Sequence, residues 1–131
     1  MNNIPRDLRY TKEHGWVRPL SGQAVELGIT DHGQDALGDL VSVELPTVGR
    51  RLAVGETYVT LESTKTTFEV ACPVSGTVAA VNTDLTDAPE RVNQDPYGKG
   101  WLVKLQVDEL SAISALLDPS AYEVVVNSEN S

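Results

Sequence analysis

The amino-acid sequence predicts a mainly β fold, either a sandwich or a flattened barrel. Seven short segments alternate apolar and polar residues or are rich in β-branched residues, and turns that contain glycine or proline separate them. Short strands at such spacing are typical of these two architectures. In chain order, the predicted strands cover residues 15–19, 24–29, 40–45, 56–62, 67–72, 77–82 and 101–107.

A short helix is predicted near residues 31–37. Thr30 or Asp31 offers a side-chain oxygen as N-cap, and Gly38 stands where a C-terminal glycine is favoured. The spacing between these signals corresponds to two helical turns.

A second helix is predicted near the C-terminus, over residues 108–117, because Leu110, Ile113, Leu116 and Leu117 share one helical face. We expect Asp118-Pro119 to end it, since a residue before proline disfavours helical backbone. A short helical turn is expected at residues 121–125 and a frayed tail at 127–131.

Length and charge limit the classes of function. The chain has 131 residues, which predicts one domain over residues 1–131. Nineteen acidic and ten basic residues give a net charge of −9, so binding to nucleic acid or to an anionic membrane is disfavoured. The sequence lacks a long apolar run and a signal-peptide pattern, which favours a cytoplasmic protein, although a processed organellar chain would look alike. We expect a monomer.

The sequence offers no recognisable catalytic or metal-binding motif. Cys72 is the single cysteine and has apolar neighbours, so we interpret it as a buried core thiol. His14 and His32 have no metal-ligand partner at a recognisable spacing, and we expect them at surface or capping positions. No serine nucleophile elbow is present. The predicted site therefore contains neither a catalytic group nor a metal.

Lys65 lies in the middle of a predicted β-hairpin. Val59 and Leu61 alternate with polar residues on one side, and Phe68 and Val70 do so on the other. The turn at residues 63–66 lacks Asn-Gly and Gly-Gly, so a loop based on a type I turn is expected rather than a tight primed turn. A lysine amine at such a tip is accessible to a modifying enzyme, and amide formation would remove its charge. An unmodified, solvated lysine is the alternative.

The residues around this hairpin and along nearly the whole chain resemble the glycine cleavage H-protein family of lipoyl carriers. A match to Glu-Ser-x-Lys alone would be weak, whereas coverage from Leu8 to Tyr122 is specific. The blocks that bear the resemblance are Leu8-Arg9-Tyr10-Thr11-Lys12-Glu13-His14, Gly28-Ile29-Thr30-Asp31-His32, Leu37-Gly38-Asp39-Leu40-Val41, Glu44-Leu45-Pro46, Glu62-Ser63-Thr64-Lys65, Pro73-Val74-Ser75-Gly76, Val92-Asn93-Gln94-Asp95-Pro96-Tyr97 and Asp118-Pro119-Ser120-Ala121-Tyr122.

The resemblance implies a barrel-sandwich hybrid of the lipoyl-domain type, with lipoate attached through an amide to Lys65 and Glu62 recognised by the lipoate-attaching enzyme. It also implies a carrier function. The arm takes an aminomethyl group from glycine decarboxylase (P protein), delivers it to an aminomethyltransferase (T protein), and is reoxidised by dihydrolipoyl dehydrogenase (L protein). The bond-making chemistry belongs to the cofactor and the partner enzymes, so the chain itself is not an enzyme.

The chain departs from the family pattern at several positions. Gly15 stands where the family usually has a glutamate that shelters the loaded arm, so that role is not carried over. Glu69 replaces an aspartate and is a candidate contact of the arm. Phe68 is expected to pack inward, since the alternation places it on the apolar face.

These departures leave two other hypotheses open: a lipoyl relay protein that supplies other complexes or a specialised pathway, and a binding module with Lys65 unmodified. A biotin carrier is disfavoured, because biotin acceptors resemble one another in flanking their lysine with methionines and Thr64 and Thr66 occupy those positions here.

Overall fold

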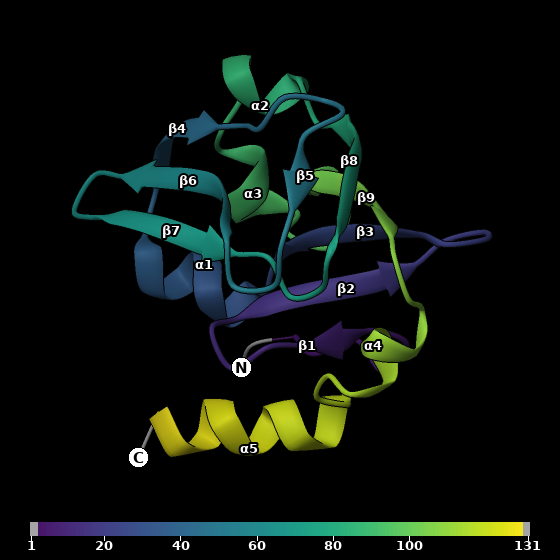
Figure 1. Ribbon diagram of the computed structural model, residues 1–131. Helices are drawn as coiled ribbons and strands as arrows, with labels where there is room; N and C mark the ends of the chain where they lie inside the picture. Colours follow the sequence, from purple (N-terminus) through teal and green to yellow (C-terminus); the bar gives the residue numbers. More distant parts are fainter. Residues whose placement is uncertain (1–2, 130–131) are drawn as a thin grey trace.

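The computed structural model describes residues 3–129, which form two antiparallel β-sheets with short helices at their edges (Figure 1). The larger sheet has the strand order β1-β2-β3-β9-β8-β5 and the smaller one the order β4-β6-β7. The strands are β1 (Arg9–Tyr10), β2 (Gly15–Pro19), β3 (Ala24–Ile29), β4 (Leu40–Glu44), β5 (Arg51–Leu52), β6 (Thr57–Ser63), β7 (Thr67–Ala71), β8 (Gly76–Val81) and β9 (Val103–Val107).

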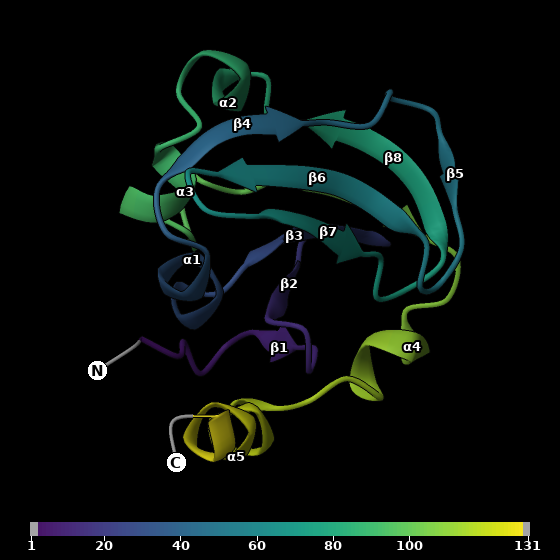
Figure 2. The same cartoon turned by 90° about the vertical axis from the view of Figure 1, so that its left-hand side faces the viewer.

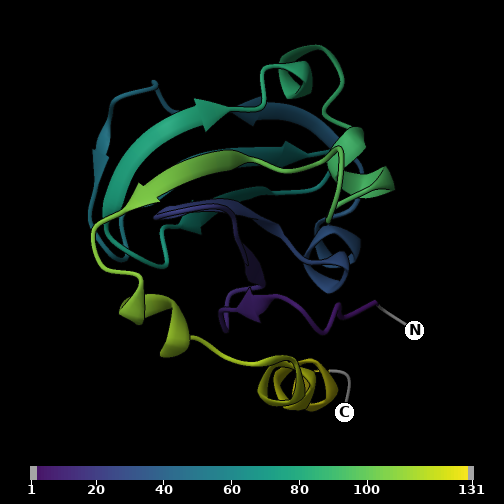
Figure 3. The ribbon, with the colours of Figure 1, turned by 90° about the vertical axis from the view of Figure 1, so that its right-hand side faces the viewer.

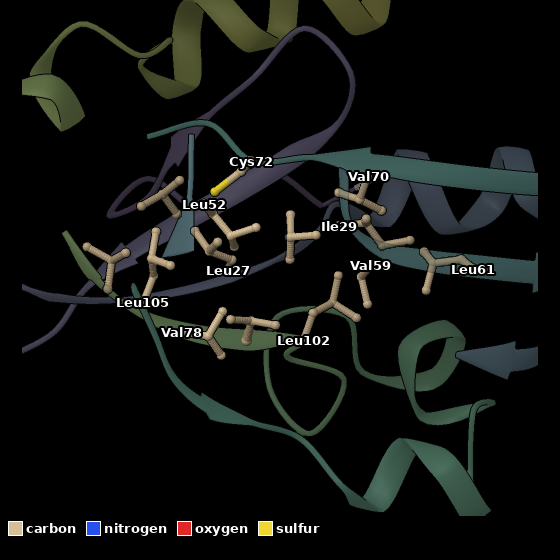
Figure 4. Packing of buried hydrophobic residues seen from close by; sticks show 14 of the residues in the cluster. Leu27, Ile29, Leu52, Val59, Leu61, Val70, Cys72, Val78, Leu102 and Leu105 are labelled. Atoms are coloured by element: carbon tan, nitrogen blue, oxygen red, sulfur yellow. The ribbon is translucent and has the colours of Figure 1, made fainter. Parts of the chain in front are cut away.

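The main core lies between the two sheets, which curve around it (Figure 2). Leu27 and Ile29 of β3 and Leu105 of β9 meet Leu61 of β6 and Val70 of β7 in this space (Figure 4). All five side chains are at most 3% exposed. The apolar alternation of the sequence therefore becomes the inward faces of two packed sheets, and the predicted mainly β fold is confirmed.

The predicted strands match the observed ones closely. β2 and β3 have the predicted bounds, and the other five predicted strands differ from the observed ones by one or two residues at an end. The sequence did not indicate β1 or β5, because two residues are too few to display alternation. β1 pairs with β2, and β5 pairs with β8.

Helix α1 (Asp31–Leu37) confirms the predicted capping. Thr30 Oγ1 accepts a hydrogen bond of 3.1 Å from the Gly33 amide, which satisfies an otherwise unpaired donor of the first turn. Gly38 ends the helix with φ of 85°, a conformation that a side chain would disfavour, and its amide donates to Gln34 O. Two further single-turn helices, α2 (Asp84–Asp87) and α3 (Arg91–Gln94), were not predicted.

The helix predicted over residues 108–117 is confirmed only in part, because the observed helix is shorter than these bounds. Only α4 (Ser111–Ser114) is helical there, because Leu117 forms a β-bridge with Tyr10. The four apolar residues also have different surroundings. Ile113 and Leu116 pack on the main core, Leu117 packs on a second cluster, and Leu110 is 43% exposed.

The longer C-terminal helix is α5 (Pro119–Glu129), which begins where the sequence was expected to end a helix. Asp118 Oδ1 accepts a hydrogen bond of 2.8 Å from the Ala121 amide, and Pro119 occupies the first helical position, where its fixed φ is favourable. Asp118-Pro119 is thus a start signal. Residues 127–129 of the expected frayed tail belong to α5, and residues 130–131 lie outside the described residues.

A second apolar cluster attaches α5 to β1 and β2 (Figure 3). Its fully or nearly fully buried members are Leu8, Tyr10, Trp16, Tyr122 and Val126. The rings of Tyr10 and Tyr122 stack with centroids 4.5 Å apart, and Trp16 Nε1 donates a hydrogen bond of 3.0 Å to Pro96 O.

Within residues 3–129, every helix is too short or too polar to span a membrane.

Gly28 allows Trp16 to pack flat against β3, and this contact predicts a clear effect of substitution. A Cβ at Gly28 would lie 2.4 Å from Trp16 Cε2. Gly28→Ala should therefore lower the free energy of unfolding by about 3 kcal/mol, since a buried indole cannot move aside without repacking the cluster. Urea unfolding followed by circular dichroism measures the change.

Gly15→Ala is the matched control, because its Cβ would have no neighbour closer than the Thr11 hydroxyl at 3.1 Å. Its effect should stay within about 1 kcal/mol. Equal stabilities for the two variants would show that Trp16 does not require the missing side chain.

Candidate functional site

Strands β6 and β7 form a hairpin (Figure 1), and the pairing of the strands places Lys65 at its turn. Leu61 pairs with Phe68 and Glu62 with Thr67, so Thr64 and Lys65 form the two-residue tip between Ser63 and Thr66. Within residues 3–129, His14 is the one non-glycine residue with positive φ, so the tip is not a primed turn. The predicted hairpin and its exclusion of a primed turn are confirmed.

The side chain of Ser63 closes this turn. Ser63 is only 6% exposed, and its Oγ accepts hydrogen bonds from the amides of Lys65 (3.3 Å) and Thr66 (3.1 Å) while donating to Thr66 O (3.1 Å). The Ser63 amide also donates to Thr66 O at 2.8 Å. The hydroxyl thus accepts from the Thr66 amide, which a primed turn would pair with the Ser63 carbonyl, and it also satisfies the Lys65 amide.

The turn rests on the connection between α1 and β4. The Thr64 amide donates to Asp39 O at 3.1 Å, and a Cβ at Gly38 would lie 2.9 Å from Lys65 Cε. The absence of a side chain at Gly38 therefore leaves space for the stem of Lys65. Asn93 of α3 fixes this connection from behind, because its Nδ2 donates to Gly38 O and its Oδ1 accepts from the Leu40 amide.

The amine of Lys65 is exposed, and it makes no ion pair or hydrogen bond with any residue in the described range 3–129. A group that is accessible and unpaired can be acylated without breaking an existing interaction. This geometry fits an amide-linked prosthetic group, because loss of the lysine charge on amide formation would leave no buried carboxylate unpaired.

The outward face of the smaller sheet is polar and acidic. Glu62 and Glu69 are exposed on β6 and β7, and Glu44 is exposed on the neighbouring strand β4, opposite Thr60. Phe68 points the other way and packs against the main core, which confirms the predicted orientation. Lys65 therefore lies at the edge of a face that carries three carboxylates.

A surface groove of about 210 Å³ lies near the far end of β7. Gly15 and Glu13 line it, as do Val70, Ala71 and Cys72. Gly15 contributes no side chain to the groove, whereas Glu13 is an exposed carboxylate beside it. Glu69 directly precedes the part of β7 that lines the groove.

Cys72 is a buried core residue, as predicted. Its thiol is 1% exposed and donates to Val74 O at 3.1 Å. Burial raises the pKa of the Cys72 thiol to about 11, so the thiolate is scarce at neutral pH. Cys72 therefore fills space between the sheets (Figure 4) rather than acting as a nucleophile.

The two histidines do not occupy the surface positions that the sequence suggested. His32 is 9% exposed and His14 is half-buried, and both face Glu129 at the end of α5. Burial lowers the pKa of His14, although the neighbouring Glu129 opposes this shift. Desolvation would raise the pKa of Glu129, but hydrogen bonds and charge from His32 and His14 lower it. No sequence spacing connects these three residues, because they lie on three separate elements.

Sequence reasoning proposed Lys65 as the candidate site and placed it at the hairpin turn, but it missed the residues that hold the turn. Gly38 was expected only to end a helix and Ser63 only to lie in the turn, and Asn93 was not assigned a role. Local patterns could not reveal them, since their partners come from other elements: Asn93 bonds to residues 53 and 55 positions earlier in the chain.

The fold and this geometry define a class of protein: a two-sheet β structure that presents one exposed lysine on a braced hairpin turn, as a carrier of a covalent group does. Comparison with known proteins agrees. The family described as "Glycine cleavage H-protein" matches residues 8–129. The chain belongs to the glycine cleavage H-protein family, whose members are lipoyl carrier subunits of that system and not catalysts.

Individual relatives support this assignment. The glycine cleavage system H protein of Mycobacterium avium (strain 104) is 54% identical over 126 residues, which cover 93% of this chain and 96% of the relative. That of Chromohalobacter salexigens is 48% identical over 129 residues and 98% of both chains. The crystal structure of a glycine cleavage system H protein from Mycobacterium marinum superposes with a TM-score of 0.83 at 40% identity, covering 92% of this chain and 97% of that one.

The hydrogen bonds of Ser63 predict that Ser63→Ala weakens the turn. Two amides would lose their acceptor, so the free energy of unfolding should fall by about 1–2 kcal/mol. Amide hydrogen exchange at Lys65 and Thr66 should accelerate more than exchange in β9. Thr67→Ala, at an exposed position next to the turn, is the control and should change both quantities little. Unchanged exchange in Ser63→Ala would rule out closure of the turn by the hydroxyl.

Proposed function

We propose that Lys65 carries lipoate in amide linkage and that the resulting arm shuttles an aminomethyl group within the glycine cleavage system. The observation that supports this most directly is an exposed, unpaired lysine at the tip of a braced hairpin, in a chain of the glycine cleavage H-protein family. When attached, lipoate supplies a dithiolane that takes up the group and is reduced. The chain supplies the attachment point and its fixed position.

A fixed attachment point matters because tethering gives the arm a high effective concentration at each docked partner. Ser63 and Asn93 restrict the turn and the connection beneath it, so the base of the arm moves little. A mobile base would reduce the fraction of time spent in reactive geometry. These residues are positioning residues, since they act through the backbone around Lys65.

Glu62 and Glu69 have proposed roles on the same face. We assign Glu62, next to the turn and exposed, to recognition by the lipoate-attaching enzyme. Glu69 is an exposed carboxylate four residues beyond Lys65 and a candidate contact of the arm. The family resemblance implies a glutamate at position 15. Gly15 stands there instead and provides no carboxylate to the groove that it lines.

The proposed partners are glycine decarboxylase, the aminomethyltransferase, dihydrolipoyl dehydrogenase and a lipoate-attaching enzyme. The exposed carboxylates of Glu62 and Glu69 support docking of basic surfaces on these enzymes, since complementary charge accelerates encounter. A cytoplasmic location, a monomeric state and a single domain over residues 1–131 stay predictions.

Gly15 favours the second candidate, a lipoyl relay that supplies other complexes. Without a carboxylate at this position, the groove is less suited to retain a charged aminomethyl arm, whereas lipoyl transfer does not require that retention. A relay and a glycine-cleavage carrier share Lys65 and differ in the partner that they serve.

Lys65→Arg tests the attachment site. Lipoylated protein mixed with glycine decarboxylase should support exchange of bicarbonate with the glycine carboxyl group, and Lys65→Arg should lose at least about 100-fold of this activity because arginine does not form the amide. Intact mass should show one lipoyl adduct only when Lys65 is present. Lys99→Arg, an exposed lysine on another loop, is the control and should behave like the wild type.

Three outcomes would contradict the proposal. A lipoyl adduct on Lys65→Arg would move the attachment site, and absence of any adduct on the wild type would favour an unmodified binding module. Exchange failure by the lipoylated wild type, together with lipoyl transfer to other acceptors, would favour the relay.

Glu62→Gln tests recognition by the lipoate-attaching enzyme. Loss of one charged contact should slow the initial rate of lipoyl transfer about tenfold, without changing stability. Glu44→Gln removes a carboxylate from the same outward face, farther from the turn, and serves as the matched control. Equal rates for the two variants would remove Glu62 from the proposed recognition site.

A further inference from the structure

Three ligand-type side chains that are distant in the sequence meet where the end of α5 contacts α1 and the turn before β2. His14 Nε2 lies 3.0 Å and His32 Nε2 lies 3.1 Å from the same oxygen, Glu129 Oε1. One ligand atom from each residue lies within 4.8 Å of the other two. We propose that His14, His32 and Glu129 bind a divalent transition-metal ion of the Zn²⁺ type.

The donor set and its geometry fit this class of ion. Two imidazole nitrogens and one carboxylate oxygen are common ligands of Zn²⁺, and tetrahedral bonds of about 2.0–2.2 Å place ligand atoms about 3.4 Å apart. The two contacts with Glu129 Oε1, of 3.0 and 3.1 Å, need to lengthen by a few tenths of an ångström to admit the ion, and the two imidazole nitrogens, which lie within 4.8 Å of each other, need to settle at the tetrahedral separation. The ion would bind the Nε2 atoms that now face Glu129 Oε1, and each neutral imidazole would carry its one proton on Nδ1.

A second layer of hydrogen bonds supports the proposed ligand His14. Its Nδ1 lies 2.8 Å from Tyr122 Oη, which lies 2.6 Å from Thr30 Oγ1. A metal on Nε2 leaves the imidazole proton on Nδ1, where the Tyr122 hydroxyl can accept it and donate to Thr30. Such an outer partner fixes the tautomer and ring orientation of metal-binding histidines.

The backbone also holds His14 in place before any ion binds. Its φ of 71° is unusual for a residue with a side chain, and two backbone hydrogen bonds maintain it: the His14 amide donates to Thr11 O (3.2 Å), and the Thr30 amide donates to His14 O (2.9 Å). His32 is fixed by the first turn of α1. The backbone at both histidines is therefore held in place by hydrogen bonds.

Glu129 gives the site its access to solvent. Its side chain is 44% exposed, whereas those of His14 and His32 are 16% and 11% exposed. Three protein ligands with one open side leave a fourth coordination position for water. The ion would join the end of α5 to α1 and to the turn before β2, and thus link three elements that are otherwise held by packing and hydrogen bonds.

Zinc titration of the full-length protein without a polyhistidine tag tests the proposal. The Lys65→Arg background is used so that no lipoyl sulfur competes for the metal. Isothermal titration should show one equivalent of Zn²⁺ bound, and the melting temperature should rise by about 5–10 °C when Zn²⁺ exceeds the dissociation constant 100-fold. Co²⁺ should give the strong visible absorption of a four-coordinate site.

Glu129→Gln and His32→Ala should each weaken Zn²⁺ binding at least about 100-fold and abolish the Co²⁺ spectrum. Glu129→Gln changes an exposed side chain at a helix end, so it keeps the test valid if His32→Ala does not fold. Glu123→Gln, on the same helix, is the control and should bind like the parent, because Glu123 pairs with Arg6 away from the cluster. Absence of saturable binding at millimolar Zn²⁺, or equal affinity in Glu129→Gln and Glu123→Gln, would overturn the proposal.

Discussion

The packing of the β6–β7 hairpin on the core is the constraint on which the carrier geometry depends. Val59, Leu61 and Val70 are at most 3% exposed, so the hairpin cannot lift from the larger sheet without exposing them to water. Because side chains alternate across a strand, burying these residues turns Glu62 and Glu69 outward. The same alternation places the turn, and Lys65 with it, beyond the edge of the buried interface. Burial of the apolar face of the hairpin therefore fixes the turn in place and leaves Lys65 exposed on it.

Helix α1 connects this hairpin with the histidine cluster. Its first turn contains His32, and the residue after its last turn, Gly38, contacts the stem of Lys65. Thr30 caps the helix and also contacts Tyr122 of α5. A ligand that joined α5 to α1 would therefore restrain an element that also borders the lysine. The two sites use different residues and different chemistry, so each is testable while the other is left intact.

Burial explains why the cysteine thiol and the buried tyrosine hydroxyls are not reactive groups. Burial raises the pKa values of the Tyr10, Tyr58 and Tyr122 hydroxyls, as it does for the Cys72 thiol. These groups stay protonated at neutral pH and serve packing and hydrogen bonding. The exposed acidic groups near Lys65, Glu62 and Glu69, lie on an open face. Such an arrangement suits a protein that presents a cofactor to enzymes and leaves bond-making to them.

The sequence by itself determined the strand pattern, helix α1 and the hairpin around Lys65, because alternation, capping residues and a short turn can each be read from residues close in the chain. Alternation specifies which strand face is apolar, and a Thr30 cap with Gly38 specifies a short helix. Its resemblance to the glycine cleavage H-protein family also indicated the carrier function that the comparisons support.

Only the tertiary structure decided the C-terminal helix and the surroundings of the two histidines. Leu117 joins a β-bridge with Tyr10, a partner more than one hundred residues away, and this pairing overrides the helical pattern of residues 108–117. Asp118-Pro119 is compatible with either end of a helix, and the docking of Tyr122 on Tyr10 selects the start. His14, His32 and Glu129 meet because the turn before β2, helix α1 and helix α5 fold together. Contacts between segments so far apart cannot be read from the local sequence.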